Sequence, residues 1–158
     1  MITRLEAPGI SGWPAETRQR RGWHQAQLRR LLTSAFGRPL VENYFNTRDI
    51  VRIYIYGEYR AAAVITAGYS GIPYLDKFAV APELQKGGIG SELWAAVSRD
   101  HPRWYWRSRQ DRAINTWYRR QANGCQAAPP WLVYWRNLSV PEANECVRHA
   151  LALPESFI

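Results

Sequence analysis

Apolar and polar residues follow patterns along the chain that predict helices and strands in a definite order. Between Arg21 and Phe36, apolar side chains recur at helical spacing, which predicts an amphipathic helix. In the segment IVRIYIYG, residues 50–57, aliphatic side chains alternate with arginine and tyrosine, which predicts a strand with two different faces. The turn at Gly57 leads into YRAAAVITA, so we expect these two strands to form a hairpin.

The rest of the chain predicts strands that are followed by helices. The patterns give strands at 73–81, 103–108 and 130–138 and helices at 88–100 and 114–122. Ser139 and Glu142 have the spacing of a capping box, and Pro141 stands in the first turn, which predicts the start of a final helix. A hairpin followed by such units predicts a mixed α/β (α+β) sheet with helices on both faces.

Composition narrows the class of protein. The chain has 158 residues, and no apolar run approaches the roughly 18 residues that a membrane span needs. The first residues lack the apolar core of a signal peptide, so we expect a cytoplasmic protein with no membrane partner. Cys125 and Cys146 match no metal or redox spacing, and His24, His101 and His149 are scattered, so we expect no metal site and no disulfide.

The formal net charge of +8 suits nucleic acid, an anionic lipid or a phosphorylated ligand. The basic residues do not form one block, however. Those of RQRR (Arg18 to Arg21) fall in the first predicted helix, where a solvated face is the simple interpretation, whereas those of WRSR stand among aromatic residues in a strand. A nucleic-acid-binding module remains an alternative, and it would need a contiguous basic surface. We expect no nucleic-acid partner.

The segment APELQKGGIGSELW places glycines between a strand and a helix, where backbone N–H groups can bind an anion. A nucleotide-binding P-loop would need Lys and Ser/Thr after its last glycine, but Gly90 precedes Ser91 and Glu92. A dinucleotide fingerprint would need a glycine where Leu93 stands. The pattern that fits is Gln/Arg-x-x-Gly-x-Gly/Ala, from Gln85 to Gly90. A plain glycine-rich turn is the alternative.

This loop, the helix and strand after it, and a short helix bearing Tyr118 resemble the GCN5-related N-acetyltransferases (GNAT). The segments YLDKFAV, WRSR, IN-x-WY and NGC make the chain similar to the acetyltransferase domain of vertebrate-like N-acetylglutamate synthases. That class includes bacterial bifunctional synthase–kinases of arginine biosynthesis. The resemblance runs from about SAFGRPL to LPESF. It implies the GNAT fold, a central mixed and mostly antiparallel sheet flanked by helices.

The resemblance also implies an activity, which is transfer of acetyl from the co-substrate acetyl-CoA to the α-amine of L-glutamate. Members of the class carry an amino-acid-kinase domain on the N-terminal side, and nothing in this chain resembles one. We therefore expect residues 1–158 to be a single acetyltransferase domain excised from a longer chain that forms a homo-oligomer. A GNAT enzyme acting on another amine is the alternative, although a peptide acceptor would not call for several cations.

The resemblance places the cofactor contacts on one stretch of chain. Backbone N–H groups and the helix dipole would hold the pyrophosphate of CoA, and Lys86 could add charge. The end of the preceding strand would offer backbone groups to the pantetheine arm and to the developing oxyanion. The residues concerned are Phe78, Ala79, Val80, Gln85, Lys86, Gly87, Gly88, Ile89 and Gly90.

Recognition of glutamate requires cations for two carboxylates. Arg107 and Arg109 stand two residues apart on one strand, so their side chains leave the same face, and each guanidinium can bind a carboxylate. Arginines on an exposed sheet face are the alternative. The resemblance adds Lys77 and Arg38 to the substrate site, and it gives Asn115 a role in orienting the substrate or the cofactor arm.

The resemblance makes Tyr118 the catalytic candidate. The amine attacks the thioester carbonyl, and the departing CoA thiolate needs a proton that a phenol can donate. A core tyrosine packed beside Trp117 is the alternative. No general base is identified from the sequence.

Overall fold

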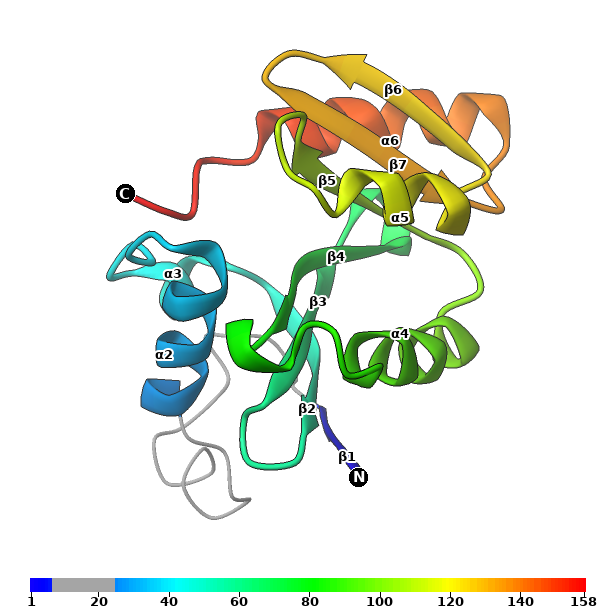
Figure 1. Cartoon of the computed structure of the whole chain (residues 1–158). Coiled ribbons are helices and arrows are strands. Elements are labelled where there is room, and N and C mark those ends of the chain that lie inside the picture. The colour runs from blue at the N-terminus through cyan, green and yellow to red at the C-terminus, as the bar shows by residue number, and fades with distance from the viewer. Residues whose placement is uncertain (7–24) are drawn as a thin grey trace. The chain divides into compact units, whose positions relative to one another are not determined.

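The computed structural model describes residues 1–6 and 25–158, which divide into two compact units (Figure 1). Unit 1 comprises the described residues of 1–66, residues 77–100 and residues 155–158, and unit 2 comprises residues 67–76 and 101–154. The strands are hydrogen-bonded in the order β1-β2-β3-β4-β5-β7-β6. Strand β4 (Pro73–Val80) gives its first half to unit 2 and its second half to unit 1.

Unit 1 is built on the predicted hairpin. Besides the second half of β4, the strands of unit 1 are β1 (Ile2–Glu6), β2 (Ile50–Tyr56) and β3 (Ala61–Ala67), of which β2 and β3 are the hairpin. Its helices are α2 (Gln25–Phe36), α3 (Tyr44–Thr47), the short 3-10 helix η3 (Pro82–Leu84) and α4 (Ile89–Asp100). Strands β1 and β3 both pair antiparallel with β2, which confirms the hairpin.

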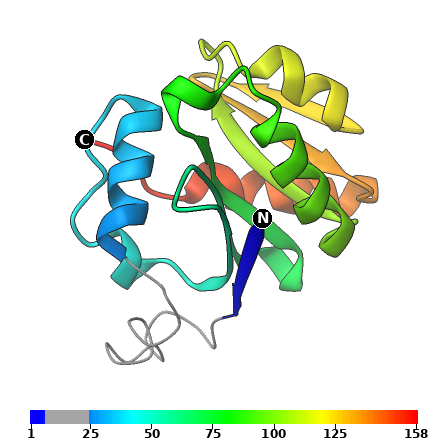
Figure 2. The same ribbon diagram turned by 60° about the horizontal axis from the view of Figure 1, so that its bottom comes forward.

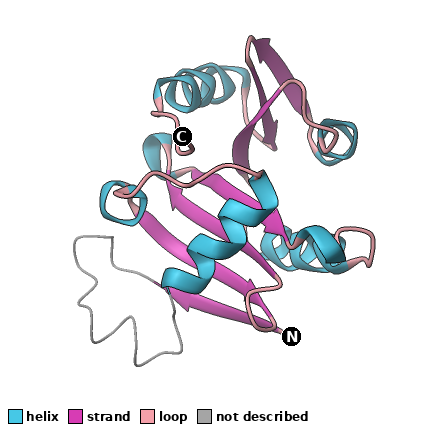
Figure 3. Ribbon diagram, turned by 60° about the vertical axis from the view of Figure 1, so that its left-hand side comes forward, coloured by secondary structure: helices cyan, strands magenta, loops and turns pink. Residues whose placement is uncertain are grey.

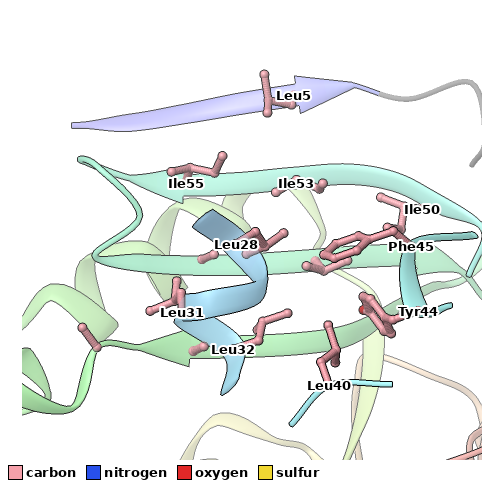
Figure 4. Packing of buried hydrophobic residues seen from close by; sticks show 14 of the residues in the cluster. Leu5, Leu28, Leu31, Leu32, Leu40, Tyr44, Phe45, Ile50, Ile53 and Ile55 are labelled. Carbon is pink, nitrogen blue, oxygen red and sulfur yellow. The ribbon is translucent and has the colours of Figure 1, made fainter. Parts of the chain in front are cut away.

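The alternating side chains of β2 contact a helix on each face of the sheet. Ile53 and Ile55 join the leucines of α2 in a buried cluster (Figure 4). On the opposite face, the Tyr54 hydroxyl lies 2.7 Å from Asp100 of α4, and the neighbouring Tyr56 hydroxyl contacts the same helix. Figure 3 shows α2 lying across the sheet of this unit. Helices therefore cover both faces of the unit 1 sheet, as the two-faced strand predicts.

Unit 2 also has helices on both faces of its strands. It contains η2 (Tyr69–Gly71), β5 (Trp104–Arg109), α5 (Asn115–Gln121), β6 (Gly124–Ala128), β7 (Trp131–Arg136) and α6 (Val140–Ala152). Strand β4 pairs parallel with β5, whereas β5–β7 and β6–β7 are antiparallel. Trp106 and Tyr134 contact Tyr118 of α5, while Tyr105 and Val133 pack in the cluster that includes α6. The sheet is thus mixed and mostly antiparallel, as expected.

The capping box that starts the last helix is confirmed. The Ser139 hydroxyl accepts a hydrogen bond from the backbone N–H of Glu142, and the Glu142 carboxylate accepts one from the backbone of Ser139. Pro141 stands in the first turn, where no helical N–H is required.

Among the described residues, the short elements β1, α3, β6, η2 and η3 were not predicted. The five residues of β1 bury only Leu5, and β6 is largely exposed, so neither carries a hydrophobic alternation of its own. Their register is set by the longer strands beside them. The first predicted helix is described from Gln25 onward, and its expected start, with Arg18 to Arg21 and His24, lies outside the described residues.

Within the part of the chain that the structure describes, no helix is long and apolar enough to cross a membrane. The same residues contain no group of three or more His, Cys, Asp or Glu side chains that could hold a metal ion.

Candidate functional site

The glycine loop after β4 forms a turn that is tied back to the strand. Gln85 donates from Nε2 to the Val80 carbonyl at 3.2 Å, and the Gly87 N–H donates to the Leu84 carbonyl at 3.1 Å. Gly88 has φ +83°, a left-handed backbone conformation that residues other than glycine rarely adopt. The chain can therefore turn sharply here and enter α4.

The N-terminus of α4 offers backbone donors. The first intrahelical bond runs from the Glu92 N–H to the Gly88 carbonyl at 3.1 Å, so the N–H groups of residues 89–91 precede the helical ladder. A Cβ added at Gly88 would meet no atom of the described residues within 4 Å, so the space beside the loop is open. Free N–H groups, a positive helix end and open space together favour an anion at this loop.

The side chains of β4 separate to two faces beneath this loop. Phe78 packs edge-on against Trp94 of α4 at 5.1 Å, and a Cβ at Gly90 would lie 3.3 Å from a methyl group of Val80. Ala79 instead packs in the cluster with α2. Phe78, Val80 and the loop therefore come together on the α4 face, while Ala79 can offer only its backbone.

Lys77 lies on the other face of β4 from Phe78 and is only 8% exposed. Its Nζ donates to the Ser156 hydroxyl at 3.1 Å and lies 5.2 Å from the centre of the Tyr44 ring. Arg38 donates to two backbone carbonyls of residues 157–158, at 3.2 and 3.3 Å. Both predicted substrate cations of unit 1 are thus engaged by the C-terminal segment.

Arg107 and Arg109 do leave the same face of β5, as predicted. Their guanidinium carbons lie 3.9 and 4.9 Å from the centre of the Trp131 ring, a residue of the neighbouring strand β7. Arg107 also donates to the carbonyls of Ala150, Leu153 and Pro154, at 2.7 to 3.1 Å. A cation at the C-terminal end of a helix is stabilising, so Arg107 has a structural role at the end of α6.

Asn115 and Tyr118 lie on the opposite face of the unit 2 sheet. Asn115 donates to the Arg109 carbonyl at 2.7 Å and accepts from the Tyr134 hydroxyl at 2.9 Å, which holds the start of α5 against β5 and β7. Tyr118 is 5% exposed and packs against Trp106 and Tyr134, each ring centre 5.5 Å away.

Burial raises the pKa of Tyr118 above its ordinary value, and the positive charge of Arg112 opposes part of that rise. The Tyr118 hydroxyl therefore keeps its proton at neutral pH and is available as a hydrogen-bond or proton donor.

In each unit, the predicted residues are sorted by face. In unit 1, Phe78 and the glycine loop lie on the α4 face, and Lys77 lies on the opposite face with α3. In unit 2, Tyr118 lies on the α5 face, whereas Arg107 lies on the α6 face. The structure therefore does not bring Tyr118 and the two β5 arginines to one face.

The sequence analysis did not single out Trp131, which contacts Arg107 and Arg109, or Ser156, which accepts hydrogen bonds from Lys77 and Arg48. The alternation of Trp131, Val133 and Trp135 could have assigned Trp131 to one face of β7. Its position opposite Arg109 depends on the β5–β7 register, which no local pattern reveals. Ser156 stands in the irregular segment LPESF, where no periodicity indicates its partner.

A family profile described as "NAT, N-acetyltransferase, of N-acetylglutamate synthase" matches residues 16–152. The chain is 36% identical over 135 residues to an acetylglutamate kinase of Xanthomonas campestris pv. campestris, which covers 80% of this chain and 32% of that protein. It is also 36% identical over 138 residues to the mitochondrial N-acetylglutamate synthases of Mus musculus and Homo sapiens, covering 84% of this chain and 26% of each relative. The chain thus spans about a third or less of the length of these curated relatives.

Solved structures share the fold at low sequence identity. A GNAT-family protein from Bacteroides thetaiotaomicron superposes with TM-score 0.59 at 14% identity, covering 94% of this chain and 95% of that one. The ribosomal-protein-S18-alanine N-acetyltransferase of Escherichia coli gives 0.57 at 12% identity, covering 88% and 96%. The PaiA N-acetyltransferase of Thermoplasma acidophilum, solved with coenzyme A, gives 0.57 at 8% identity, covering 87% and 99%.

Proposed function

Since this chain belongs to the N-acetyltransferase family of N-acetylglutamate synthase, we propose that it transfers acetyl from acetyl-CoA to the α-amine of L-glutamate. The products are N-acetyl-L-glutamate and CoA. The family match over residues 16–152 carries the proposal, and the GNAT fold of the chain supports it.

The glycine loop supplies the binding site for CoA in this proposal. The N–H groups at the start of α4 bind the pyrophosphate, with Lys86 adding positive charge and Gln85 holding the loop against β4. The ladder between β4 and β5 consists of the pairs that involve Tyr74 and Leu75. The backbone of residues 78–80 lies beyond that ladder and is assigned to the pantetheine arm and the oxyanion.

Lys77, Arg107 and Arg109 are the cations that we propose for the carboxylates of glutamate. Arg107 also donates to three carbonyls at the end of α6, so it has a structural role in addition to this assignment. Arg38 donates to two carbonyls of the C-terminal segment, so we propose that it holds this segment beside Lys77. Asn115 acts by positioning the start of α5.

In the proposed mechanism, the acetyl group passes directly from acetyl-CoA to the amine. The neutral amine attacks the thioester carbonyl, the C–S bond breaks, and the CoA sulfur leaves as a thiolate. Tyr118 donates its proton to that thiolate and regains one from solvent, while the new amide nitrogen loses its extra proton to water. A buried tyrosine that stays protonated is suited to this step.

We further propose that these 158 residues belong to a longer cytoplasmic chain of arginine biosynthesis that carries an amino-acid-kinase domain and forms a homo-oligomer. The relative from Xanthomonas campestris named acetylglutamate kinase, of which this chain covers 32%, supports the longer chain. No nucleic-acid partner is included in this proposal.

The proposed function is tested by following CoA thiol release from acetyl-CoA with each of the twenty amino acids. Glutamate is expected to give the highest kcat/KM. Preference for a different amine would favour another GNAT activity. Salt-sensitive binding of nucleic acid without thiol release would favour the basic module.

Arg109→Ala is expected to raise the KM for glutamate and to leave the KM for acetyl-CoA nearly unchanged. Loss of a charge-assisted bond to a carboxylate costs about 1.5–3 kcal/mol, or roughly ten- to over a hundredfold in affinity. Arg107→Ala should also lower the melting temperature, because the carbonyls that end α6 lose their donor. Steady-state kinetics and thermal melts measure both effects.

Arg103→Ala is the matched control, because Arg103 precedes the same strand but pairs with Glu142 at the surface. It should leave the KM for glutamate unchanged. If Arg109→Ala behaves like this control, the assignment of Arg109 to a substrate carboxylate is wrong.

A further inference from the structure

The last residues of the described chain form a strap along unit 1. Two backbone hydrogen bonds, of 2.7 and 2.8 Å, and an antiparallel bridge between Leu40 and Phe157 join residues 39–41 to 156–158. The Phe157 ring stacks on Phe36 at the end of α2, with ring centres 4.6 Å apart. Figure 2 shows the C-terminus beside α2. We call residues 155–158 the C-terminal strap.

Ser156 of the strap holds two buried cations. Its hydroxyl accepts from Lys77 Nζ at 3.1 Å and from Arg48 Nη2 at 2.8 Å. Ser156 is 2% exposed, Lys77 8% and Arg48 7%. The Tyr44 ring lies near both cations, 5.2 Å from Lys77 Nζ and 5.7 Å from the Arg48 guanidinium carbon. One hydroxyl oxygen has two lone pairs and can accept from both donors.

A hydroxyl partner has a different consequence from a carboxylate partner. It holds the ammonium group in place by a hydrogen bond, but it adds no negative charge that would compete with an anionic ligand. Lysine has a long side chain that loses much of its rotamer freedom when it is ordered. A hydroxyl that restricts Lys77 beforehand therefore reduces the entropy cost of binding a carboxylate.

We propose that Ser156 is a positioning residue for Lys77, and that the C-terminal strap thereby sets the affinity for a carboxylate of the amino-acid substrate. The inference rests on the proposed function, because Lys77 is assigned there to glutamate. Ser156 acts through Lys77 and has no contact with the reacting atoms.

Ser156→Ala tests the hydroxyl, and Ser156→Asp tests the charge. Ser156→Ala is expected to raise the KM for glutamate about tenfold, the lower end of the range for a bond to a charged group, with kcat and the KM for acetyl-CoA unchanged. Ser156→Asp is expected to raise the KM for glutamate further, since a carboxylate at this place would neutralise Lys77. A purely structural serine would lower the melting temperature without this selective change in KM.

Phe36→Leu is the matched control, because it removes the ring that stacks on Phe157 and leaves Ser156 and Lys77 in place. It is expected to lower the melting temperature and to leave the KM for glutamate unchanged. A wild-type KM in Ser156→Ala, or an equal rise in Phe36→Leu, would overturn the inference.

A second measurement separates this inference from the proposed function. The ¹⁵Nζ resonance of Lys77 reports whether its ammonium group is held, and it should shift and broaden in Ser156→Ala. If the wild-type protein does not acetylate glutamate, the proposed function and the substrate role of Lys77 both fail. An unchanged Lys77 resonance, with glutamate still acetylated, would overturn only the positioning role of Ser156.

Discussion

Tyr118→Phe is expected to lower kcat by about 10²–10⁴-fold, the usual contribution of general acid catalysis, with both KM values nearly unchanged. The variant keeps the ring that packs against Trp106 and Tyr134, so the buried aromatic cluster stays filled. It removes the hydroxyl whose proton the CoA thiolate needs. Thiol-release kinetics measure the effect. Because burial raises the pKa of Tyr118, the wild-type kcat should show no loss of this proton below about pH 10.

Two controls separate proton donation from packing. Tyr134→Phe removes a hydroxyl from the same cluster, one that donates to Asn115, and it should affect the melting temperature more than kcat. An acetyl thioester with a thiol of lower pKa should restore Tyr118→Phe more than wild type, because its leaving group needs the proton less. A fall in kcat without that rescue would indicate positioning instead. A fully active Tyr118→Phe protein would remove Tyr118 from the mechanism.

Gly88→Val is expected to abolish measurable binding of CoA. The backbone at position 88 has a left-handed φ of +83°, which costs a residue with a side chain roughly 1–2 kcal/mol. The loop of the variant is therefore shifted or strained. The new side chain would also occupy the open space beside the N–H groups of α4. Isothermal titration calorimetry with CoA measures the loss. Gly90→Val should act in the same direction, because its Cβ would press on Val80.

Gly71→Val provides a matched control for the backbone effect. Gly71 has φ +80°, and a Cβ there would likewise meet no described atom within 4 Å, but it lies in η2 of unit 2. Both variants should lose similar stability, and only Gly88→Val should lose CoA. If a folded Gly88→Val protein binds CoA like the wild type, the loop is a plain turn and does not bind pyrophosphate.

The sequence alone was sufficient for the order of the long elements. The alternation in 50–56 predicted a two-faced strand, and both faces are covered by helices. The spacing of Ser139 and Glu142 predicted the last helix start, and the reciprocal bonds are present. These features depend on neighbours at most four residues away, which is the range that a local pattern records. The short strands β1 and β6 have no such pattern, since their partners supply their register.

The sequence also predicted which residues carry the chemistry, but the tertiary structure decided what each side chain contacts. Spacing placed Arg107 and Arg109 on one face, and both do stack on Trp131. Only the fold shows that Arg107 donates to carbonyls more than 40 positions away, at the end of α6. Only the fold shows that Tyr118 lies on the opposite face of that sheet.

Lys77 illustrates why local sequence predicts the face of a strand but not the contacts on that face. Its place in YLDKF predicted a substrate cation, yet its hydroxyl partner Ser156 stands 79 residues later in a segment without periodicity. Periodicity determines which face of a strand a side chain takes, because the backbone repeats locally. The donor and acceptor that meet on that face come from chain segments brought together by packing, and no local repeat encodes that meeting.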